Sequence, residues 1–518
     1  MKSQEPTVIP VKYKLLLAML GLIGIGIILL ATNRYGAGLS PDSVGYVATA
    51  RSIANGTGIV TFDGSPLVKQ PPLYPAILAT IDYVFGLDPL SSANIVNAVL
   101  FGIIVYLGGL LIYKHLSSFP AFALVGMLAI VFSRPLFGIA VWAWSEPLFI
   151  CFVLLSLIFA HSYLAKNDVT SLMLFSSSVA LSSLIRYIGA TLILWGALII
   201  LVFYRDSLKN RIAHLSLFTL ISALPLGLWL IRNYAISSTL FGPRASSAFT
   251  LSQNLIFLFN SLLYWYIPGR IKEHRSILMI VSAGAGLFIG LSLRDGWQGV
   301  KVRLRQISPI VLFAIIYIAF LVISSTTIAY DKIDDRLLSS IYVPLTLLLL
   351  ILAQALVDPY RKRFSKKIVN SFLVIGIAIW LAFQIRSTIL NAVNLIPIGQ
   401  GYSGQAWMDN KTVQYLLQHR TLESECTFYT NDSNVAYILA DIKTKMSPIR
   451  RIYNSIKTVN DISSLRGVWP EESNACLIWF DEIDQGKYMF TIDELQAIAN
   501  IELIVRLEDG AIYSITRK

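Results

Sequence analysis

The side chains able to do chemistry in this chain are carboxylates and cations. The five histidines are scattered, and they neither have metal-ligand spacing nor fit a Ser-His-acid arrangement. The sequence therefore predicts no metal ligands and implies no cofactor, while it leaves dependence on a divalent metal open. A reaction carried by such a chain would use a carboxylate as the base and fixed cations to stabilise developing negative charge.

Charged residues at the ends of long apolar segments are the first candidates for a site. Charge next to hydrocarbon is costly and often marks function. On the face that we expect to lie outside the cytoplasm, these residues are Asp42, Arg51, Lys69, Arg134, Glu146, Arg186, Arg232, Arg244, Asp334, Asp335 and Arg336.

Each of the strongest candidates also has a simpler explanation. Asp42 could do no more than complement the positive end of a helix. Arg186 and Arg336 could extend to the membrane interface along their apolar stems. Glu146, which precedes Pro147, could only begin a helix.

The residues around Asp42 predict a helix that begins next to it. Ser40-Pro41 has the pattern of an N-cap followed by proline at the first helical position, and Asn55-Gly56 ends the helix about four turns later. Tyr46, four residues after Asp42, shares its face. Arg51 falls on the opposite face, where we expect it to meet lipid headgroups.

The composition indicates a multi-pass membrane protein. The chain is 55% hydrophobic and 14% charged, with a mean hydropathy of +0.65. Apolar stretches recur that are long enough to cross the bilayer as helices. We expect eleven spans, although the fifth and sixth could form one helix broken at Arg186. They are 13–32, 94–113, 117–134, 147–165, 170–185, 190–204, 213–231, 276–293, 308–326, 338–357 and 369–387.

Lysine and arginine set the expected orientation. They gather between spans on the side of the N-terminus, most densely in RKRFSKK at 361–367, so this side is predicted to be cytoplasmic. The first span is then an uncleaved anchor of the plasma membrane. The net charge of +12 follows from this topology and from contact with anionic lipids, and it requires no nucleic acid.

The expected domains are a transmembrane domain over 1–387, with long outer loops at 33–93 and 232–275, and a soluble extracytoplasmic α/β domain over 388–518. In the latter, strands are predicted at 426–430, 475–480, 501–507 and 511–515, with helices near 432–440 and 491–499. Cys426 and Cys476 each open a strand, and the outer compartment permits a disulfide between them. Cys151, within the fourth span, is expected to serve packing.

The first outer loop resembles that of the GT-C glycosyltransferases, in the branch of protein O-mannosyltransferases and lipid A aminoarabinose transferases. That loop carries an acidic residue, a tyrosine four positions later, a helix ending near glycine and a downstream Pro-Pro element. Here these features are Asp42, Tyr46, Gly56 and Pro71-Pro72. Weaker similarity extends to SEPLF, LIRYIG, WLIRNY and IDDRLL, at 145–149, 184–189, 229–234 and 333–338. Two departures are Ser43, where many relatives have a second acid, and Gln70, which separates Lys69 from Pro71.

The resemblance implies transfer of a sugar from a polyprenyl-phosphate donor to a hydroxyl of a lipid, glycan or protein acceptor, with inversion. Asp42 would be the base. The residues implied in substrate binding are Tyr46, Lys69, Tyr74, Glu146, Arg186, Arg232 and Arg336. Of these cations, Lys69, Arg186, Arg232 and Arg336 would stabilise the departing phosphate. Alternatives are a lipid or glycan transporter, a surface-polysaccharide polymerase or ligase, and a non-catalytic scaffold.

Overall fold

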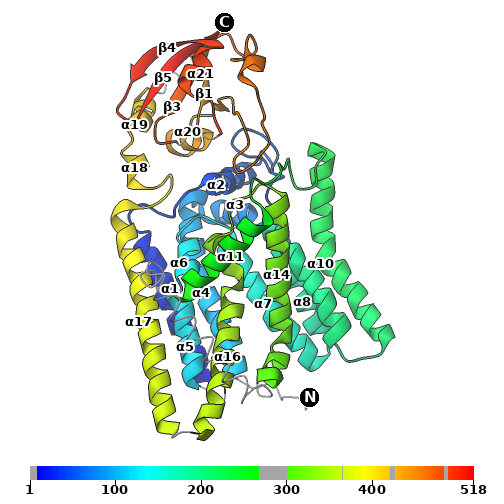
Figure 1. Ribbon diagram of the computed structural model, residues 1–518. Helices are drawn as coiled ribbons and strands as arrows, with labels where there is room; N and C mark the ends of the chain where they lie inside the picture. Colours follow the sequence, from blue (N-terminus) through cyan, green and yellow to red (C-terminus); the bar gives the residue numbers. More distant parts are fainter. Residues whose placement is uncertain (1–8, 118–119, 268–299, 364–365, 420–425, 484–487) are drawn as a thin grey trace.

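The computed structural model of the protein describes residues 9–117, 120–267, 300–363, 366–419, 426–483 and 488–518. It has a bundle of long apolar helices, with a small sheet domain at one end (Figure 1). The start of α1, the end of α16 and the start of α17 lie at the other end of the bundle. The predicted fold class, a polytopic helical domain followed by an α/β domain, is confirmed.

The bundle coincides with the predicted spans wherever the structure describes them. Eight helices in the described residues are long and apolar enough to cross a membrane, and two shorter apolar segments cover 169–185 and 187–203. The span expected at 276–293 lies outside the described residues. Helices α5 and α6 together form one of these eight, as do α15 and α16, and the two shorter segments contain α8 and α9. The bounds of these helices are α1 (Val11–Ala31), α4 (Pro89–Leu116), α5 (Pro120–Val131), α6 (Arg134–Ala140), α7 (Glu146–Lys166), α8 (Val169–Ile185), α9 (Ala190–Leu198), α10 (Leu208–Ser237), α14 (Ser308–Thr327), α15 (Asp335–Leu338), α16 (Tyr342–Arg363) and α17 (Lys366–Ile398).

Close packing of α1 on α4 depends on two glycines. A Cβ atom built on Gly21 would lie 2.9 Å from the carbonyl oxygen of Gly102, and one built on Gly102 would lie 2.9 Å from that of Gly21. Small residues let membrane helices approach at backbone distance, where dispersion and packing replace the hydrophobic effect as the source of association. This contact fixes the helix that leads into the first outer loop.

The chain breaks at Arg186 between the fifth and sixth apolar segments. Helix α8 ends at Ile185, and Arg186 has extended backbone angles, φ −146° and ψ 137°. A short 3-10 turn, Tyr187–Gly189, then leads into α9. The sequence allowed one helix over the fifth and sixth spans, broken at Arg186, and the structure has this break. The Arg186 side chain points toward Glu146 of α7.

Three helices lie at the sheet-domain end of the bundle: α2 (Pro41–Ala54), α3 (Leu73–Phe85) and α11 (Leu251–Tyr266) (Figure 1). The predicted start of α2 is confirmed, since the Ser40 hydroxyl accepts from the amide of Ser43 and the Ser43 hydroxyl accepts from that of Ser40. Helix α3 begins at Leu73, directly after the Pro71-Pro72 element.

The sheet domain has five strands in the order β2-β1-β3-β5-β4. Strand β1 is parallel to β2 and β3, whereas β5 is antiparallel to its two neighbours, β3 and β4. All six residues of the central strand β3 are buried, because core side chains cover both faces of the sheet. The bounds are β1 (Thr427–Thr430), β2 (Lys445–Met446), β3 (Ala475–Phe480), β4 (Ala499–Arg506), β5 (Gly510–Arg517), α18 (Gln405–Met408), α19 (Lys411–Gln418), α20 (Ser433–Ala440) and α21 (Ile492–Gln496).

The four predicted strands and both predicted helices of this domain are present. Strand β2 was not expected, since a two-residue strand has too few side chains to show an alternation. Helix α17 continues to Ile398, so the transmembrane helix ends later than the predicted 387.

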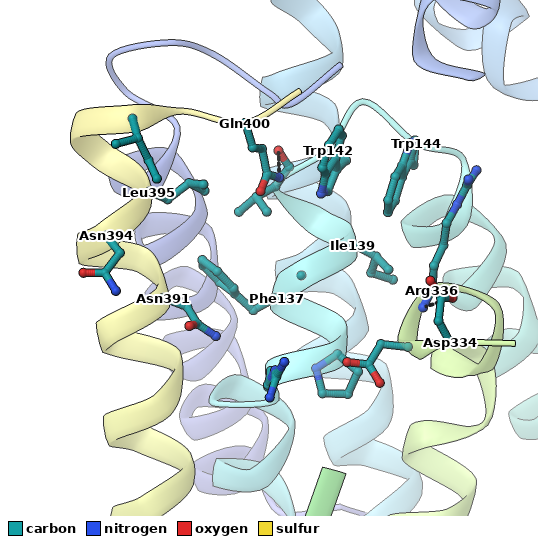
Figure 2. A pocket seen from close by; sticks show the side chains of 16 residues that line it. Phe137, Ile139, Trp142, Trp144, Asp334, Arg336, Asn391, Asn394, Leu395 and Gln400 are labelled. Carbon is teal, nitrogen blue, oxygen red and sulfur yellow. Dashed lines mark hydrogen bonds between the residues drawn. The ribbon is translucent and has the colours of Figure 1, made fainter. Parts of the chain in front are cut away.

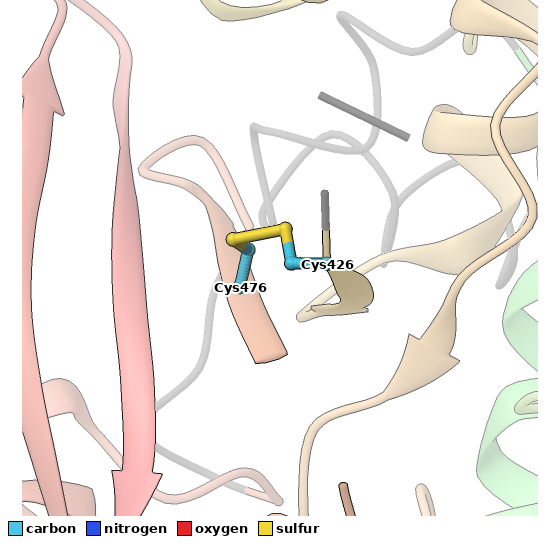
Figure 3. Close-up of a disulfide and its surroundings, with 2 residues drawn as sticks. All are labelled: Cys426 and Cys476. Carbon is cyan, nitrogen blue, oxygen red and sulfur yellow. A yellow bond between two sulfur atoms is a disulfide. The ribbon is translucent and has the colours of Figure 1, made fainter. Parts of the chain in front are cut away.

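Cys426 and Cys476 form a disulfide between the starts of β1 and β3 (Figure 3). Their Cα atoms are 5.8 Å apart, and the bond closes a loop with a sequence separation of 50 residues. Cys151 is a free, buried thiol, in agreement with its predicted packing role.

We expect the Cys426→Ser/Cys476→Ser double variant to loosen the sheet domain. Closing a loop of this length stabilises a fold by about 2–4 kcal/mol, mainly by restricting the unfolded chain. Amide hydrogen exchange in β3 should therefore accelerate by roughly 10²-fold in the full-length protein. Cys151→Ala is the matched control, because this thiol lies in α7. Unchanged exchange in β3 of the double variant would contradict the prediction.

The sheet domain is tied to the segment that enters α2. Gly38 pairs with Trp142 and Leu39 pairs with Gly401, both in parallel bridges, so residues 38–39 lie between two other chain segments. The amide of Tyr402 donates to the carbonyl oxygen of Leu39 at 2.9 Å, and the Tyr402 hydroxyl donates to Asp432 at 2.8 Å. The domain thus contacts the chain a few residues before Asp42.

Candidate active site

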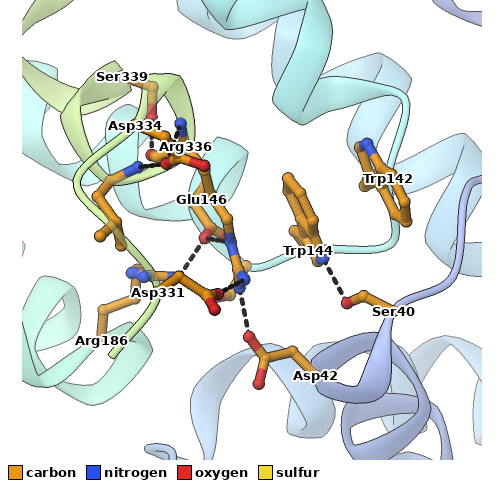
Figure 4. A network of polar contacts seen from close by, with 12 residues as sticks. Ser40, Asp42, Trp142, Trp144, Glu146, Arg186, Asp331, Asp334, Arg336 and Ser339 are labelled. Atoms are coloured by element: carbon orange, nitrogen blue, oxygen red, sulfur yellow. Dashed lines mark hydrogen bonds and ion pairs between the residues drawn. The ribbon is translucent and has the colours of Figure 1, made fainter. Parts of the chain in front are cut away.

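Asp42 lies in the first turn of α2, with each carboxylate oxygen bound to a different part of the chain. Its Oδ2 pairs with Nη2 of Arg336 at 2.5 Å, and its Oδ1 accepts from Nε2 of Gln70 at 2.7 Å (Figure 4). The Asp42 side chain is 40% exposed. Asp42 is therefore held in one orientation and remains accessible.

Arg336 bridges the carboxylates of Asp42 and Glu146, and its Nη1 also lies 3.8 Å from Oδ2 of Asp331. Asp334 caps the short helix α15 by accepting from the amides of Arg336 and Leu337, and this places the Arg336 side chain. Besides its contact with Asp42, its Nε pairs with Oε1 of Glu146 at 2.5 Å. The guanidinium also lies over the ring of Trp144, 4.1 Å from its centroid. A planar, forked cation is suited to such a position, since it can address both carboxylates at once.

Glu146 is the buried centre of the cluster. Its side chain is 2% exposed, and its Oε1 also pairs with Nη1 of Arg186 at 2.6 Å. Its Oε2 is buried without a hydrogen-bond partner among the described residues. Two guanidiniums thus balance the carboxylates of Asp42 and Glu146, and a charge this deep is tolerated because it is paired.

The arginines of the cluster do not extend to the membrane interface. The side chains of Arg186 and Arg336 are 19% and 12% exposed, and both point to Glu146. This excludes the simpler explanation considered for them. Glu146 begins α7, as its simpler explanation requires, but it also pairs with both arginines. Asp42 lies at the start of α2 and also forms an ion pair with Arg336.

Tyr46 and Tyr74 are buried next to the cluster. The Tyr46 hydroxyl lies 3.0 Å from Oγ of Ser145, which also accepts from Arg186. The rings of Tyr46 and Tyr74 meet edge to face at 5.1 Å, and Tyr74 donates to Asn97. Both tyrosines are buried, and burial raises the pKa of each phenol, so both stay protonated.

A second group of cations lies along residues 59–70 of the first loop. Arg232 donates to the carbonyl oxygens of Leu67 at 2.6 Å and Ile59 at 3.4 Å. Arg244 donates to the carbonyl oxygen of Lys69 at 2.9 Å. The Lys69 side chain is exposed, and its ammonium has no ion pair with any described residue. Among the described residues, no carboxylate forms an ion pair with these three cations, unlike Arg186 and Arg336.

Several contacts of the site were missed by sequence reasoning. Gln70, noted only as a departure from the family pattern, orients Asp42. Trp144 connects Arg336 with α2, because its Nε1 donates to Oγ of Ser40 at 2.8 Å. The sequence signal that could have identified Trp144 is its position directly before the SEPLF motif at 145–149. Arg51 pairs with Asp88 at 2.8 Å, so the expectation that it meets headgroups was wrong.

Electrostatics keep Asp42 ionised. Burial alone would raise the pKa of its carboxyl, but the charges of Arg336 and Arg186 and the hydrogen bonds from Arg336 and Gln70 hold that pKa below its ordinary value of 3.8. Among the described residues, no group of three or more His, Cys, Asp or Glu side chains could hold a metal ion.

No family model matches the chain, and no curated protein sequence matches it. Its fold does match solved structures. The crystal structure of ArnT from Cupriavidus metallidurans in the apo state gives a TM-score of 0.58 at 12% identity, over 96% of this chain and 97% of that one. The structure of the same protein bound to undecaprenyl phosphate gives 0.59 at 14%, with the same coverage.

The S. cerevisiae protein O-mannosyltransferase Pmt1-Pmt2 complex, bound to the sugar donor, matches a smaller part. Its TM-score is 0.36 at 16% identity, over 47% of this chain and 39% of that one. Because the ArnT structures match both the helical bundle and the sheet domain, the chain has the fold of ArnT over nearly its whole length.

Proposed function

We propose that the protein is a membrane glycosyltransferase that moves a sugar from a polyprenyl-phosphate donor to an acceptor hydroxyl. One observation carries the proposal: an accessible carboxylate, Asp42, held by Arg336 at the end of a membrane bundle with the ArnT fold. The donor class follows from the ArnT structure that binds undecaprenyl phosphate. The acceptor would be a lipid, glycan or protein, and Asp42 would be the base.

The proposed reaction is a single displacement. The acceptor hydroxyl gives its proton to the Asp42 carboxylate as its oxygen bonds to the anomeric carbon, and the bond from that carbon to the phosphate oxygen breaks. The electron pair leaves with the polyprenyl phosphate, which is already an anion and needs no general acid. Attack from the face opposite the leaving group inverts the anomeric configuration. The Asp42 proton then passes to water.

The two groups of cations would have different tasks. Arg186 and Arg336 are matched by Glu146 and Asp42, so their main effect is to position the base. Lys69, with Arg232 and Arg244 beside it, carries uncompensated positive charge and is the better partner for the departing phosphate. Phosphate binding by Lys69 and Arg232, as the resemblance implies, remains part of the proposal. Tyr46, Tyr74 and Glu146 would shape the site from inside.

We further propose that the start of α1 is cytoplasmic and that the sheet domain, which follows Ile398, lies outside a plasma membrane of bacterial type. The start of α1, the end of α16 and the start of α17 lie at one end of the bundle, and the sequence over 361–367 is rich in lysine and arginine. The disulfide at the other end fits an oxidising compartment. A reporter active only in the cytoplasm, fused after residue 400, should be inactive, and high activity would reverse the orientation.

Purified full-length protein, a radiolabelled polyprenyl-phosphate sugar and membrane extract as the acceptor source test the function. We expect acceptor-dependent release of the unglycosylated carrier, with label passing to the acceptor. A transporter would move the donor across vesicles without releasing carrier, and a scaffold would do neither. Absence of release with every acceptor source would refute the proposal.

Trp144 should act through the position of Arg336. Trp144→Phe keeps an aromatic face under the guanidinium but loses the hydrogen bond to Ser40, whereas Trp144→Leu loses both. Since such cation–π contacts contribute roughly 0.5–2 kcal/mol, we expect turnover to fall by about threefold in the first variant and by about tenfold or more in the second. Trp142→Phe is the control, because the Trp142 ring stacks on that of Trp144, with the ring planes 5° apart. Equal losses in all three would indicate a packing role only.

A further inference from the structure

A segment of the sheet domain touches the outer loops of the membrane domain next to the active site. Residues 453–459 reach from the sheet domain to the bundle (Figure 1). Tyr453 and Ile456 are 60% and 73% exposed, whereas Ser455 is 4% exposed. Its hydroxyl donates to the carbonyl oxygen of Ser246 at 2.7 Å. Ser455 is therefore buried by the loop that it meets, although its neighbours are open.

Three chain segments meet at this contact. Residues 245–248, which follow α10, lie between residues 328–329, which follow α14, and residues 454–455 of the sheet domain. The contacts are antiparallel bridges of Ser247 with Ser455 and of Ser246 with Ile328, and hydrogen bonds from the amide of Ala248 to the carbonyl oxygen of Asn454 at 2.9 Å and from the amide of Ala329 to that of Ala245 at 2.8 Å. Because hydrogen bonds are directional, these contacts fix how the three segments align.

Asn454 has a backbone conformation that suits this contact. Its φ is 54°, in the left-handed region that asparagine tolerates better than most residues other than glycine. In this conformation its Nδ2 donates to the carbonyl oxygen of Tyr330 at 3.1 Å, while its own carbonyl oxygen accepts from the amide of Ala248. One residue of the sheet domain thus bonds both outer segments.

Tyr330 extends the contact toward the cations of the first loop. The guanidinium of Arg244 lies over the Tyr330 ring, 5.5 Å from its centroid. Arg244 also donates to the carbonyl oxygen of Lys69 at 2.9 Å. Because an aromatic face attracts a guanidinium, the position of the Tyr330 ring helps to set where the charge of Arg244 lies.

The residue after Tyr330 reaches the other side of the site. Oδ2 of Asp331 lies 3.8 Å from Nη1 of Arg336, whose Nη2 pairs with Asp42 (Figure 4). Arg336 also lines a pocket of about 360 Å³, and Asp331 is not among the residues that line it (Figure 2). Asp331 therefore meets Arg336 from outside that pocket. The segment that Asn454 holds thus lies between the cations of the first loop and the base.

We infer that Asn454 of the sheet domain is a positioning residue of the active site, which holds Tyr330 and thereby sets the place of Arg244 against the phosphate of the donor. The contact itself is independent of the reaction, whereas its effect on donor binding rests on the proposed function. A cation that is already fixed binds phosphate more tightly than a mobile one, because less ordering is left to occur on binding. The sheet domain is therefore a working part of the active site.

Amide hydrogen exchange in the full-length protein tests the contact. Asn454→Gly keeps access to the left-handed backbone and adds no charge, but it loses the side-chain hydrogen bond. Asn460→Gly is the matched control, because Nδ2 of Asn460 also donates to a backbone carbonyl, that of Ile449 within the sheet domain. We expect exchange at Ala248 and Ala329 to accelerate about fivefold in the first variant only, on the scale of one hydrogen bond. Unchanged exchange in Asn454→Gly would overturn the inference.

Kinetics with a radiolabelled polyprenyl-phosphate sugar then test the positioning role. Asn454→Gly should raise the donor KM about fivefold and leave the acceptor KM unchanged. Arg244→Gln should raise the donor KM by itself, and adding Asn454→Gly to it should have little further effect, because the two residues act as one unit. An unchanged donor KM in Asn454→Gly, or independent effects that multiply in the double variant, would overturn the positioning role.

Failure of the proposed function would look different. If the wild-type protein releases no carrier with any acceptor, the glycosyltransferase proposal fails. The exchange rates at Ala248 and Ala329 would still decide whether Asn454 holds the two outer segments in place.

Discussion

Replacement of Asp42 by asparagine is expected to lower sugar transfer by roughly 10²- to 10⁴-fold, the scale for loss of a positioned base. Asparagine can still accept from Gln70, and the helix start is capped by Ser40, so folding should survive. Turnover in the purified assay, together with thermal unfolding in detergent, measures the two effects separately.

Asp88→Asn is the matched control for this variant. Asp88 is also a carboxylate at a helix start that pairs with an arginine, but it lies outside the cluster, so near-normal turnover is expected. If Asp42→Asn kept near-normal transfer, another acid would have to be the base, and Glu146 would be tested first.

The pH dependence follows from the lowered pKa of Asp42. A carboxyl whose pKa is below 3.8 in the folded protein is ionised throughout the neutral and mildly acidic range, so Asp42 should cause no loss of activity between about pH 8 and pH 5. The same group stabilises the folded state above its unfolded pKa, and this contribution is lost as the pH falls through the folded value. An acid limb above pH 5 that disappears in Asp42→Asn would contradict this account.

Arg336→Met is expected to give the largest loss of stability, together with loss of turnover. It removes one of the two guanidiniums that pair with the nearly inaccessible Glu146, and breaking a buried pair in this way costs about 3–5 kcal/mol. Thermal unfolding in detergent should show the change directly. Arg336→Lys retains the charge, but one ammonium cannot replace the separate Nε and Nη2 contacts, so turnover should fall by roughly 10²-fold with a smaller loss of stability.

The comparison variant is Arg51→Met, which also breaks an arginine-carboxylate pair. That pair is solvent-exposed, so the expected cost is about 1 kcal/mol or less. A similar, small destabilisation in Arg336→Met and Arg51→Met would show that the cluster is not held together by Arg336.

Local signals predicted much of this structure, whereas contacts between distant segments were not predictable. The Ser40-Pro41 pattern located α2, and a short apolar run located β3, because each depends on neighbouring residues. Charge at span ends identified Glu146 and Arg336, but no spacing rule shows that residues separated by 190 positions share an ion pair.

Because contacts between distant segments were not predictable, the contact partners of Arg232 and Gln70 were not predicted either. Arg232 has the same side chain as Arg336, yet it bonds to backbone carbonyls of the first loop, since its helix places it beside that loop. Gln70 was noticed only because it departs from the family pattern, and the turn of the loop brings it to Asp42.

The bridges before α2 also have a consequence for biosynthesis. Ser403 donates to the carbonyl oxygen of Ala37, a contact between residues 366 positions apart, and Leu39 pairs with Gly401 in the same region. The ribosome makes one partner long after the other, and in the proposed topology the later partner must cross the bilayer behind α17 before the contact can form. A nascent chain that has inserted only its first helices therefore lacks the segment that holds residues 37–39 in front of α2. If the proposed topology holds, transfer activity should appear only after the last domain has been translocated.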